Sequence, residues 1–192
     1  MTKSLKDMSL EELWGLFPIF LTEHRAEWDK WYVDERNFLL KHLPNERILR
    51  INHAGSTSIP NIWAKPIVDI YLEVQTADDA KIISDLIKQN GYTCMAEVPR
   101  FHRIDFNKGY TIHGFANRVF HLHLRLVGDN SELYFRDYLI DHPEIAKQYE
   151  SLKMKLWKQF ENNRDAYTNY KGEFISKYTA LAKSFYLNRY SN

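Results

Sequence analysis

The chain has 192 residues, a length that suits one domain and that buries enough surface to fold without disulfides or structural metals. Its 26 basic and 25 acidic residues almost cancel, which argues against a broad basic surface for non-specific nucleic-acid binding. The single cysteine, Cys94, excludes an internal disulfide and a multi-cysteine metal site, and its place in an apolar segment predicts a packed thiol.

The N-terminal quarter of the chain predicts two helices. Ser9-Leu10-Glu11-Glu12 has the pattern of a capping box, and apolar residues follow it at helical spacing up to Leu21. A second helical pattern runs from Trp28 to Leu39 and ends by Pro44, because proline cannot continue a helix.

The centre of the chain predicts a sheet with one helix. Runs of β-branched and aromatic residues favour strands, and these runs cover residues 47–53, 67–74, 92–98, 100–106 and 118–127. A helix is expected over residues 76–90, with Gly91 as its stop. Residues 107–117, rich in glycine and polar groups, are expected to form a loop or a hairpin.

After Gly128 the pattern becomes helical. One helix is expected around residues 133–140. A second begins after Asp141, which is expected to cap it, with Pro143 in its first turn. Asn162 or Asn163 is expected to cap the last helix, whose apolar side ends at Phe185.

These elements predict an α+β fold. We expect residues 1–22 to form an N-terminal helical extension and residues 23–192 to form a single domain. Within that domain the α/β core covers about 23–128 and a helical part covers about 129–190. Residues 67–74 and 118–127 should lie close together in a central mixed sheet, with helices packed on one side.

A turn of small residues precedes the strongest strand. Gly55 permits backbone angles that let amide groups converge on an anion, and Ser56 and Thr57 add short hydroxyl donors. This combination is what a phosphate cradle needs. The structural alternative is a tight surface turn capped by serine and threonine.

Asp69 lies fourteen residues after Gly55, between apolar strand neighbours. A carboxylate in such a strand needs a metal or a basic partner to offset its desolvation. Alternation places Asp69, Tyr71 and Glu73 on one face of the strand. Sites that bridge two magnesium ions usually carry a second carboxylate two residues after the first, and Tyr71 occupies that place here.

His121, His123 and Arg125 share one face of another expected strand. Two histidines at this spacing, with Asp69 as a third ligand, suit a transition metal such as Zn²⁺ or Mn²⁺. The histidines could instead serve as phosphate donors or as a general base, or form a hydrogen-bonded polar strand face.

Several basic residues are candidate phosphate partners. Lys65 precedes the Asp69 strand, and Arg118 and Arg125 flank the histidine pair. Lys153 and Lys171 lie within apolar stripes of the C-terminal helices. A lysine in such a stripe either extends to its edge or lines a cleft.

With these residues assembled, the chain resembles the GrpB family, a group placed in the nucleotidyltransferase-like superfamily with a core of the DNA polymerase beta type. The resemblance covers about residues 23–186. It is carried by the segments His-Ala-Gly-Ser-Thr (53–57), Ala-Lys-Pro-Ile-Val-Asp (64–69), His-Leu-His (121–123), Phe-Arg-Asp-Tyr-Leu (135–139) and Tyr-Glu-Ser-Leu-Lys (149–153).

The resemblance implies a nucleotidyltransferase-like core with a helical C-terminal part. It implies Asp69, His121 and His123 as catalytic or metal-binding residues, a divalent metal (Mg²⁺, Mn²⁺ or Zn²⁺), and a nucleotide or other phosphorylated small molecule as ligand. Tyr71 departs from the superfamily's pattern at the second carboxylate.

Three function classes stay open from the sequence. The first is an enzyme that moves a nucleotidyl group from a nucleoside triphosphate to an acceptor that the sequence does not name. The second is a catalytically silent module that binds nucleotides or phosphate, and the third is an interaction domain. The lack of a signal peptide and of an apolar run near 20 residues predicts a cytoplasmic protein without a membrane partner.

Overall fold

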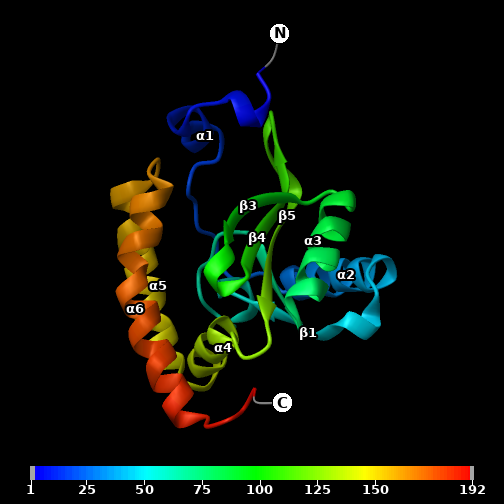
Figure 1. Cartoon of the computed structure of the whole chain (residues 1–192). Helices are drawn as coiled ribbons and strands as arrows, with labels where there is room; N and C mark the ends of the chain where they lie inside the picture. Colours follow the sequence, from blue (N-terminus) through cyan, green and yellow to red (C-terminus); the bar gives the residue numbers. More distant parts are fainter. Residues whose placement is uncertain (1–2, 191–192) are drawn as a thin grey trace.

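A five-stranded mixed sheet runs through the middle of the computed structural model, which describes residues 3–190 (Figure 1). The strands are β1 (Ile48–Ala54), β2 (Val68–Val74), β3 (Thr93–Val98), β4 (Arg103–Thr111) and β5 (Gly114–Leu126). Their order in the sheet is β1-β2-β5-β4-β3. The β2–β5 pair is parallel and the other pairs are antiparallel. The ends of the expected extension (1–22) and domain (23–192) fall outside the described residues.

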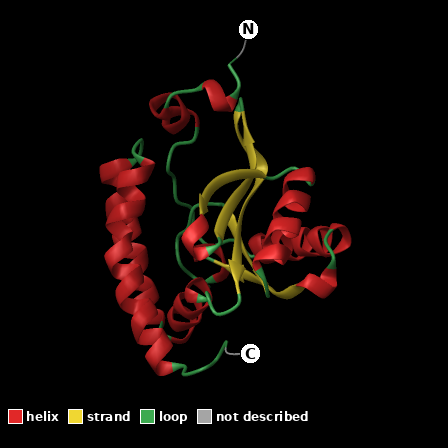
Figure 2. Ribbon diagram, viewed as in Figure 1, coloured by secondary structure: helices red, strands yellow, loops and turns green. Residues whose placement is uncertain are grey.

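Helices account for most of the remaining chain (Figure 2). They are α1 (Leu10–Leu16), α2 (Glu27–His42), α3 (Ala77–Gln89), α4 (Ser131–Asp141), α5 (Pro143–Phe160) and α6 (Arg164–Phe185). The local signals predicted most of their starts. Ser9 and Glu12 form the capping box of α1, and the Asn163 side chain accepts a hydrogen bond from the Ala166 amide at the start of α6.

The predicted central pairing is confirmed. β2 and β5 are direct neighbours, with Asp69 opposite His121 and Tyr71 opposite His123. The apolar residues of both strands pack against α2 and α3 in the main core, where Ile70, Leu72 and Leu122 are all fully buried. This core holds the sheet rigid from one side.

The sequence led us to expect all helices on that side of the sheet, but the structure places some of them on the other side. Leu133 of α4 packs against Ala54 and Tyr71 on the opposite face of the sheet. The α5–α6 pair stands beside this second face, well away from α2 and α3 (Figure 1). The strand residues that face α4 to α6 are largely polar. A cavity separates part of this face from α5 and α6.

Residues 107–117 form a hairpin, one of the two expected alternatives, in which only Ile112 and His113 separate β4 from β5. Two other local predictions need correction. Asp141 is the last residue of α4, and the cap position of α5 falls on His142, whose backbone lies outside the helical region, as is usual before a proline. Cys94 is exposed, because it lies in the edge strand β3, where every residue is exposed.

The segment after α1 is joined to the rest of the fold. Ile19 donates its amide to the Glu161 carbonyl, and Thr22 pairs with Ala64 in an isolated β-bridge. Ile19 and Leu21 are buried. The boundary at residue 22 stays a prediction.

Candidate functional site

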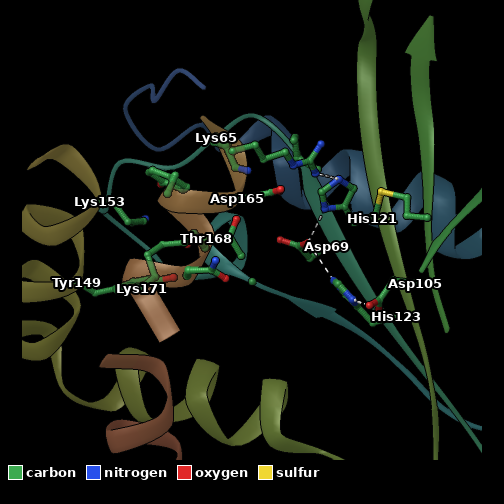
Figure 3. A pocket seen from close by; sticks show the side chains of 17 residues that line it. Lys65, Asp69, Asp105, His121, His123, Tyr149, Lys153, Asp165, Thr168 and Lys171 are labelled. Atoms are coloured by element: carbon green, nitrogen blue, oxygen red, sulfur yellow. Dashed lines mark hydrogen bonds and ion pairs between the residues drawn. The ribbon is translucent and has the colours of Figure 1, made fainter. Parts of the chain in front are cut away.

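A cavity of about 650 Å³ lies between the polar face of the sheet and the α5–α6 pair. The side chains enter it from two sides (Figure 3): Asp69, Asp105, His121 and His123 come from the strands, and Tyr149, Lys153, Asp165 and Lys171 come from the helices. We call it the main cavity. Its remaining lining residues are Gly55, Ser56, Lys65, Ile67, Met95, Arg164, Tyr167, Thr168 and Asn169.

Gly55 and Asp69 are in direct contact at the floor of the main cavity. Gly55 has a φ of +65°, a conformation that favours glycine, and a Cβ there would lie 2.0 Å from Asp69 Oδ2. Ala54 pairs with Asp69 across β1 and β2, which brings the turn to the carboxylate. The Gly-Ser turn therefore needs its glycine because the Asp69 side chain occupies the space of a side chain at position 55.

His123 is held between two carboxylates. Its Nε2 donates to Asp69 Oδ1 at 3.1 Å and its Nδ1 donates to Asp105 Oδ1 at 2.8 Å. Burial opposes the charge of the ring, but the hydrogen bonds to Asp105 and Asp69 outweigh it and raise the pKa of His123 to about 10. His123 is therefore an imidazolium at neutral pH, and it orients Asp69 rather than accepting a proton.

His121 has the opposite charge state. Burial lowers its pKa to about 4, although its contact with Asp69 acts in the other direction. The neutral ring directs Nδ1 to Asp69 Oδ1 at 3.4 Å, and Nε2 accepts a hydrogen bond from the Tyr110 hydroxyl at 2.9 Å. The pKa of Asp69 stays well below its usual range, because the contacts with the two histidines outweigh the effect of its burial.

Tyr110 reaches the cavity face because β4 is irregular beside it. The register of β4 against β5 shifts between Lys108 and Tyr110. Gly109 lies within the shift with a φ of +92°, and a Cβ there would lie 2.4 Å from the Arg118 carbonyl oxygen. Regular alternation would have turned Tyr110 toward the apolar face with Phe106. The bulge brings it beside His121 instead.

Four cationic side chains line the main cavity: Lys65, Lys153, Arg164 and Lys171. None of them forms an ion pair with a carboxylate among residues 3–190. Their charged groups lie instead near the rings of tyrosines: Lys65 and Lys171 over Tyr167, Lys153 over Tyr149 and Arg164 over Tyr110.

The unpaired lysines have lowered pKa values. Burial and the neighbouring Lys171 lower the pKa of Lys153 to about 7. Burial lowers the pKa of Lys171 to about 8. The neighbouring Asp69 opposes this shift, and Arg164 adds to it. The pKa of Lys65 is also lowered, by burial and then by Lys171 and Arg164. The cavity thus gathers four basic side chains that form no direct ion pair with a carboxylate of the described residues, although the nearby Asp69 favours the charged form of the three lysines.

Three residues expected to hold phosphate lie outside the main cavity. Thr57 is buried and hydrogen-bonded to His53 and to the Ile67 carbonyl. Arg118 is exposed and pairs with Asp34. Arg125 does point to the polar face, but Asp105 and Glu132 both bind its guanidinium at 2.8 Å. These side chains are engaged within the fold, and the structure does not bring them into the main cavity.

The expected three-ligand metal centre does not fit this arrangement. Both nitrogens of His123 donate to carboxylates, and both nitrogens of His121 contact Asp69 and Tyr110. Residues 3–190 contain no group of three or more His, Cys, Asp or Glu side chains placed to hold a metal ion. The place of the second carboxylate holds the buried phenol of Tyr71, which donates to Glu73.

Sequence reasoning missed several residues in or beside the site, and those with the clearest contacts are Asp105, Tyr110, Tyr149 and Arg164. Gly109 was the signal for Tyr110, since an isolated glycine in a strand pattern suggests a bulge. Asp105 alternates with Phe106 in β4 and could have been assigned to the polar face. No residue pattern identified Arg164, which lies at the first position of α6 and reaches the cavity only through the packing of α5 and α6.

No helix within residues 3–190 combines the length and the apolar character needed to cross a bilayer.

The fold defines the class of protein. The structure of the Cid1 poly(U) polymerase bound to Mg 3′-dATP matches this chain with a TM-score of 0.50 and 11% sequence identity, over 84% of this chain and 51% of that chain. At this identity the match shows a shared fold, and that fold is nucleotidyltransferase-like.

The chain belongs to the GrpB family, whose profile, described as GrpB protein, matches residues 18–181. The crystal structure of the conserved protein GrpB from Enterococcus faecalis matches with a TM-score of 0.75 and 29% identity, over 87% of this chain and 99% of that chain. The resemblance to this family is thereby confirmed.

Two curated relatives differ in length. The UPF0157 protein YqkA of Bacillus subtilis is 37% identical over 160 residues, which are 81% of this chain and 45% of that protein. The glutamate-rich protein GrpB of Alkalihalophilus pseudofirmus is 31% identical over 163 residues, 83% of this chain and 92% of that protein. The chain therefore spans less than half of YqkA and most of the second relative.

Proposed function

We propose that the main cavity binds the phosphate chain of a nucleotide or of another phosphorylated small molecule. One observation carries this proposal: Lys65, Lys153, Lys171 and Arg164 surround one cavity without a carboxylate partner in the described part of the chain. An anionic ligand would supply the missing countercharge.

The energetic reason is the cost of burying charge. Moving an ammonium group out of water without a partner costs on the order of several kcal/mol of free energy, unless the group loses its proton or meets an anion. Lys153 is 2% exposed, and its hydrogen bond goes to the neutral carbonyl of Trp63. A phosphate oxygen beside its Nζ would offset the penalty, so the cavity is poised for a ligand with several negative charges.

The Gly-Ser turn complements these cations. The left-handed Gly55 and the hydroxyl of Ser56 border the same cavity, and a short helical turn follows at Ser56–Ser58. Hydroxyl and amide donors at such a turn suit phosphate oxygens. We assign Gly55 and Ser56 to orient the phosphates, and the lysines to neutralise them as point charges.

A divalent metal remains part of the proposal at Asp69 alone. Magnesium is usually held by one or two carboxylates together with substrate phosphates, without a complete protein cage. Asp69 stays ionised and borders the cavity, so it suits that role. Mg²⁺ is favoured over Zn²⁺, because the ring nitrogens of both histidines are hydrogen-bonded to Asp69 and to other side chains, and Mg²⁺ prefers oxygen ligands.

A second candidate function is transfer of a nucleotidyl group from a nucleoside triphosphate to an acceptor. The observation that favours it is the direct contact between Asp69 and Gly55 within a nucleotidyltransferase-like fold. A phosphate chain on the turn would pass beside this carboxylate. A buried tyrosine at position 71 favours the catalytically silent alternative, since it replaces the second carboxylate that a two-metal site usually uses.

A thermal-shift titration tests both candidates. Tripolyphosphate and ATP, each with and without Mg²⁺, are added to the wild type and to Asp69→Asn. Binding at a hundred times the dissociation constant should add about 2.7 kcal/mol of stability. If Asp69 holds Mg²⁺, the metal strengthens binding to the wild type and this gain disappears in Asp69→Asn.

If no metal is involved, Asp69→Asn binds both anions more tightly, because a repelling charge is gone. Failure of both anions to stabilise the wild type would contradict the proposal itself. Conversion of ATP to a nucleotidylated acceptor and pyrophosphate, followed by ³¹P NMR, then separates transfer from silent binding.

A further inference from the structure

A second cavity, of about 400 Å³, opens beside the main cavity, and the two meet at Asp69. They share the lining residues Gly55, Ser56, Asp69, His123, Tyr149 and Lys171. The rest of its wall comes chiefly from α4, through Glu132, Phe135 and Arg136, and from α6, through Ile175 and Thr179. Its volume falls within the range of about 300–1,000 Å³ that is common for ligand pockets.

The charges of the second cavity are paired, unlike those of the main cavity. Arg103 binds both carboxylate oxygens of Asp129, at 2.5 and 2.6 Å. Arg136 pairs with Asp137 at 2.6 Å. Glu132 pairs with Arg125 at 2.8 Å. Lys171, which belongs to both cavities, is the exception. A charged ligand would therefore meet little uncompensated charge in the part of the wall that only the second cavity has.

The other wall residues suit a neutral ligand. The ring of Phe135 and the side chain of Ile175 provide apolar surface, and Ser131 and Thr179 provide hydroxyl groups. A ligand pocket with apolar walls and a few convergent polar groups selects molecules of the same mixed character. Sugars, nucleosides and hydroxyl-bearing side chains have that character.

We propose that the second cavity binds a neutral, hydroxyl-bearing molecule while the main cavity holds the phosphate ligand. The role of the main cavity in this inference rests on the proposed function. Two ligands placed in this way would meet at Asp69, on the rim that both cavities share. Group transfer between two ligands requires two adjoining chambers of this kind.

Saturation-transfer NMR tests the inference with three neutral probes: D-glucose, uridine and N-acetyltyrosinamide. We expect at least one to bind, and its signal to persist when tripolyphosphate is present at saturation. Ile175→Trp and Thr179→Trp, which place a large ring in the second cavity, should each remove the signal. The dissociation constant for tripolyphosphate should stay within twofold of the wild-type value in both variants.

Leu181→Trp is the matched control, because it adds the same ring at an exposed position of α6 outside both cavities. It should keep the probe signal. The inference is overturned if no probe binds, if tripolyphosphate displaces the bound probe, or if the probe still binds to the folded filling variants. If the wild type binds a neutral probe but not tripolyphosphate, the proposed function is overturned, and what remains is a site for hydroxyl-bearing molecules that depends on Ile175.

Discussion

The two faces of β2 and β5 carry different kinds of side chains. On one face, Ile70, Leu72, Leu122 and Leu124 are fully buried against α2 and α3. On the other, one residue away along each strand, Asp69 and the two histidines border the main cavity. Strand alternation thus separates the side chains that hold the fold together from those that border the main cavity.

The two faces also differ in regularity. The apolar face consists of regular alternation, whereas the cavity face depends on two exceptions. The left-handed Gly55 brings the Gly-Ser turn against Asp69, and the bulge at Gly109 turns Tyr110 toward His121. Changes on the apolar face should therefore alter stability, and changes on the cavity face should alter binding.

The largest expected effect on stability belongs to the apolar face. Leu122→Ala removes a fully buried side chain from the core and should lower the free energy of unfolding by about 2–5 kcal/mol. Urea denaturation measures this loss. Tripolyphosphate affinity of the remaining folded protein should change less than twofold, and a loss of affinity without a loss of stability would contradict the division between the faces.

Gly55→Ala should affect both properties, because it lies where the turn meets the strand. Its Cβ would overlap Asp69 Oδ2, and its φ of +65° strains any other residue, at a cost of about 1–3 kcal/mol. We also expect at least a tenfold loss of tripolyphosphate affinity in calorimetry. Gly172→Ala, in α6 with no neighbour within 4 Å of its Cβ, is the control and should be neutral or stabilising.

The pH dependence of binding should follow the lysines. The pKa values of Lys153 and Lys171, about 7 and about 8, lie below the ordinary lysine value, so both are charged at pH 6.5 and lose protons as the pH rises. Tripolyphosphate affinity should therefore fall between pH 7 and pH 9, by about tenfold for each lysine if its charged hydrogen bond is worth about 1.5 kcal/mol. An affinity that rises over this interval would argue against lysine contacts.

The smallest effect is expected at Arg118. Its exposed ion pair with Asp34 lies outside both cavities, and such pairs contribute about 0–1 kcal/mol. Arg118→Ala should leave tripolyphosphate affinity unchanged and shift the free energy of unfolding by less than about 0.5 kcal/mol. A clear loss of affinity would restore Arg118 as a phosphate partner.

The sequence predicted the parts of the site that follow from alternation and from local turn chemistry. Asp69, His121 and His123 share a face because strand periodicity requires it, and Gly55 stands out because of its conformational freedom. Lys153 and Lys171 were open to two interpretations, since a lysine inside an apolar stripe lies either at an edge or in a cavity. The packing of α5 and α6 beside the sheet decides between the two.

The errors concern partners that are distant in sequence. Arg125 has the right face for phosphate, but Glu132 and Asp105 occupy it, and neither pairing follows from a local pattern. In the same way, Asp69 and Asp105 both engage the His123 ring, and the contact with Asp105, from a neighbouring strand, follows from no local pattern. Helices were expected on one side because their order along the chain does not reveal which face each one covers.

The central claim is that the basic side chains of the main cavity, which form no ion pairs within the described residues, bind phosphate. Calorimetric titration of a matched pair of variants tests this claim most directly. Lys153→Met/Lys171→Met removes two cavity charges from α5 and α6. Lys155→Met/Lys177→Met removes two exposed charges from the same helices. We predict that the cavity variant folds normally and loses at least a hundredfold in tripolyphosphate affinity, while the surface variant stays within threefold of the wild type. Equal affinity in the two variants would contradict the claim.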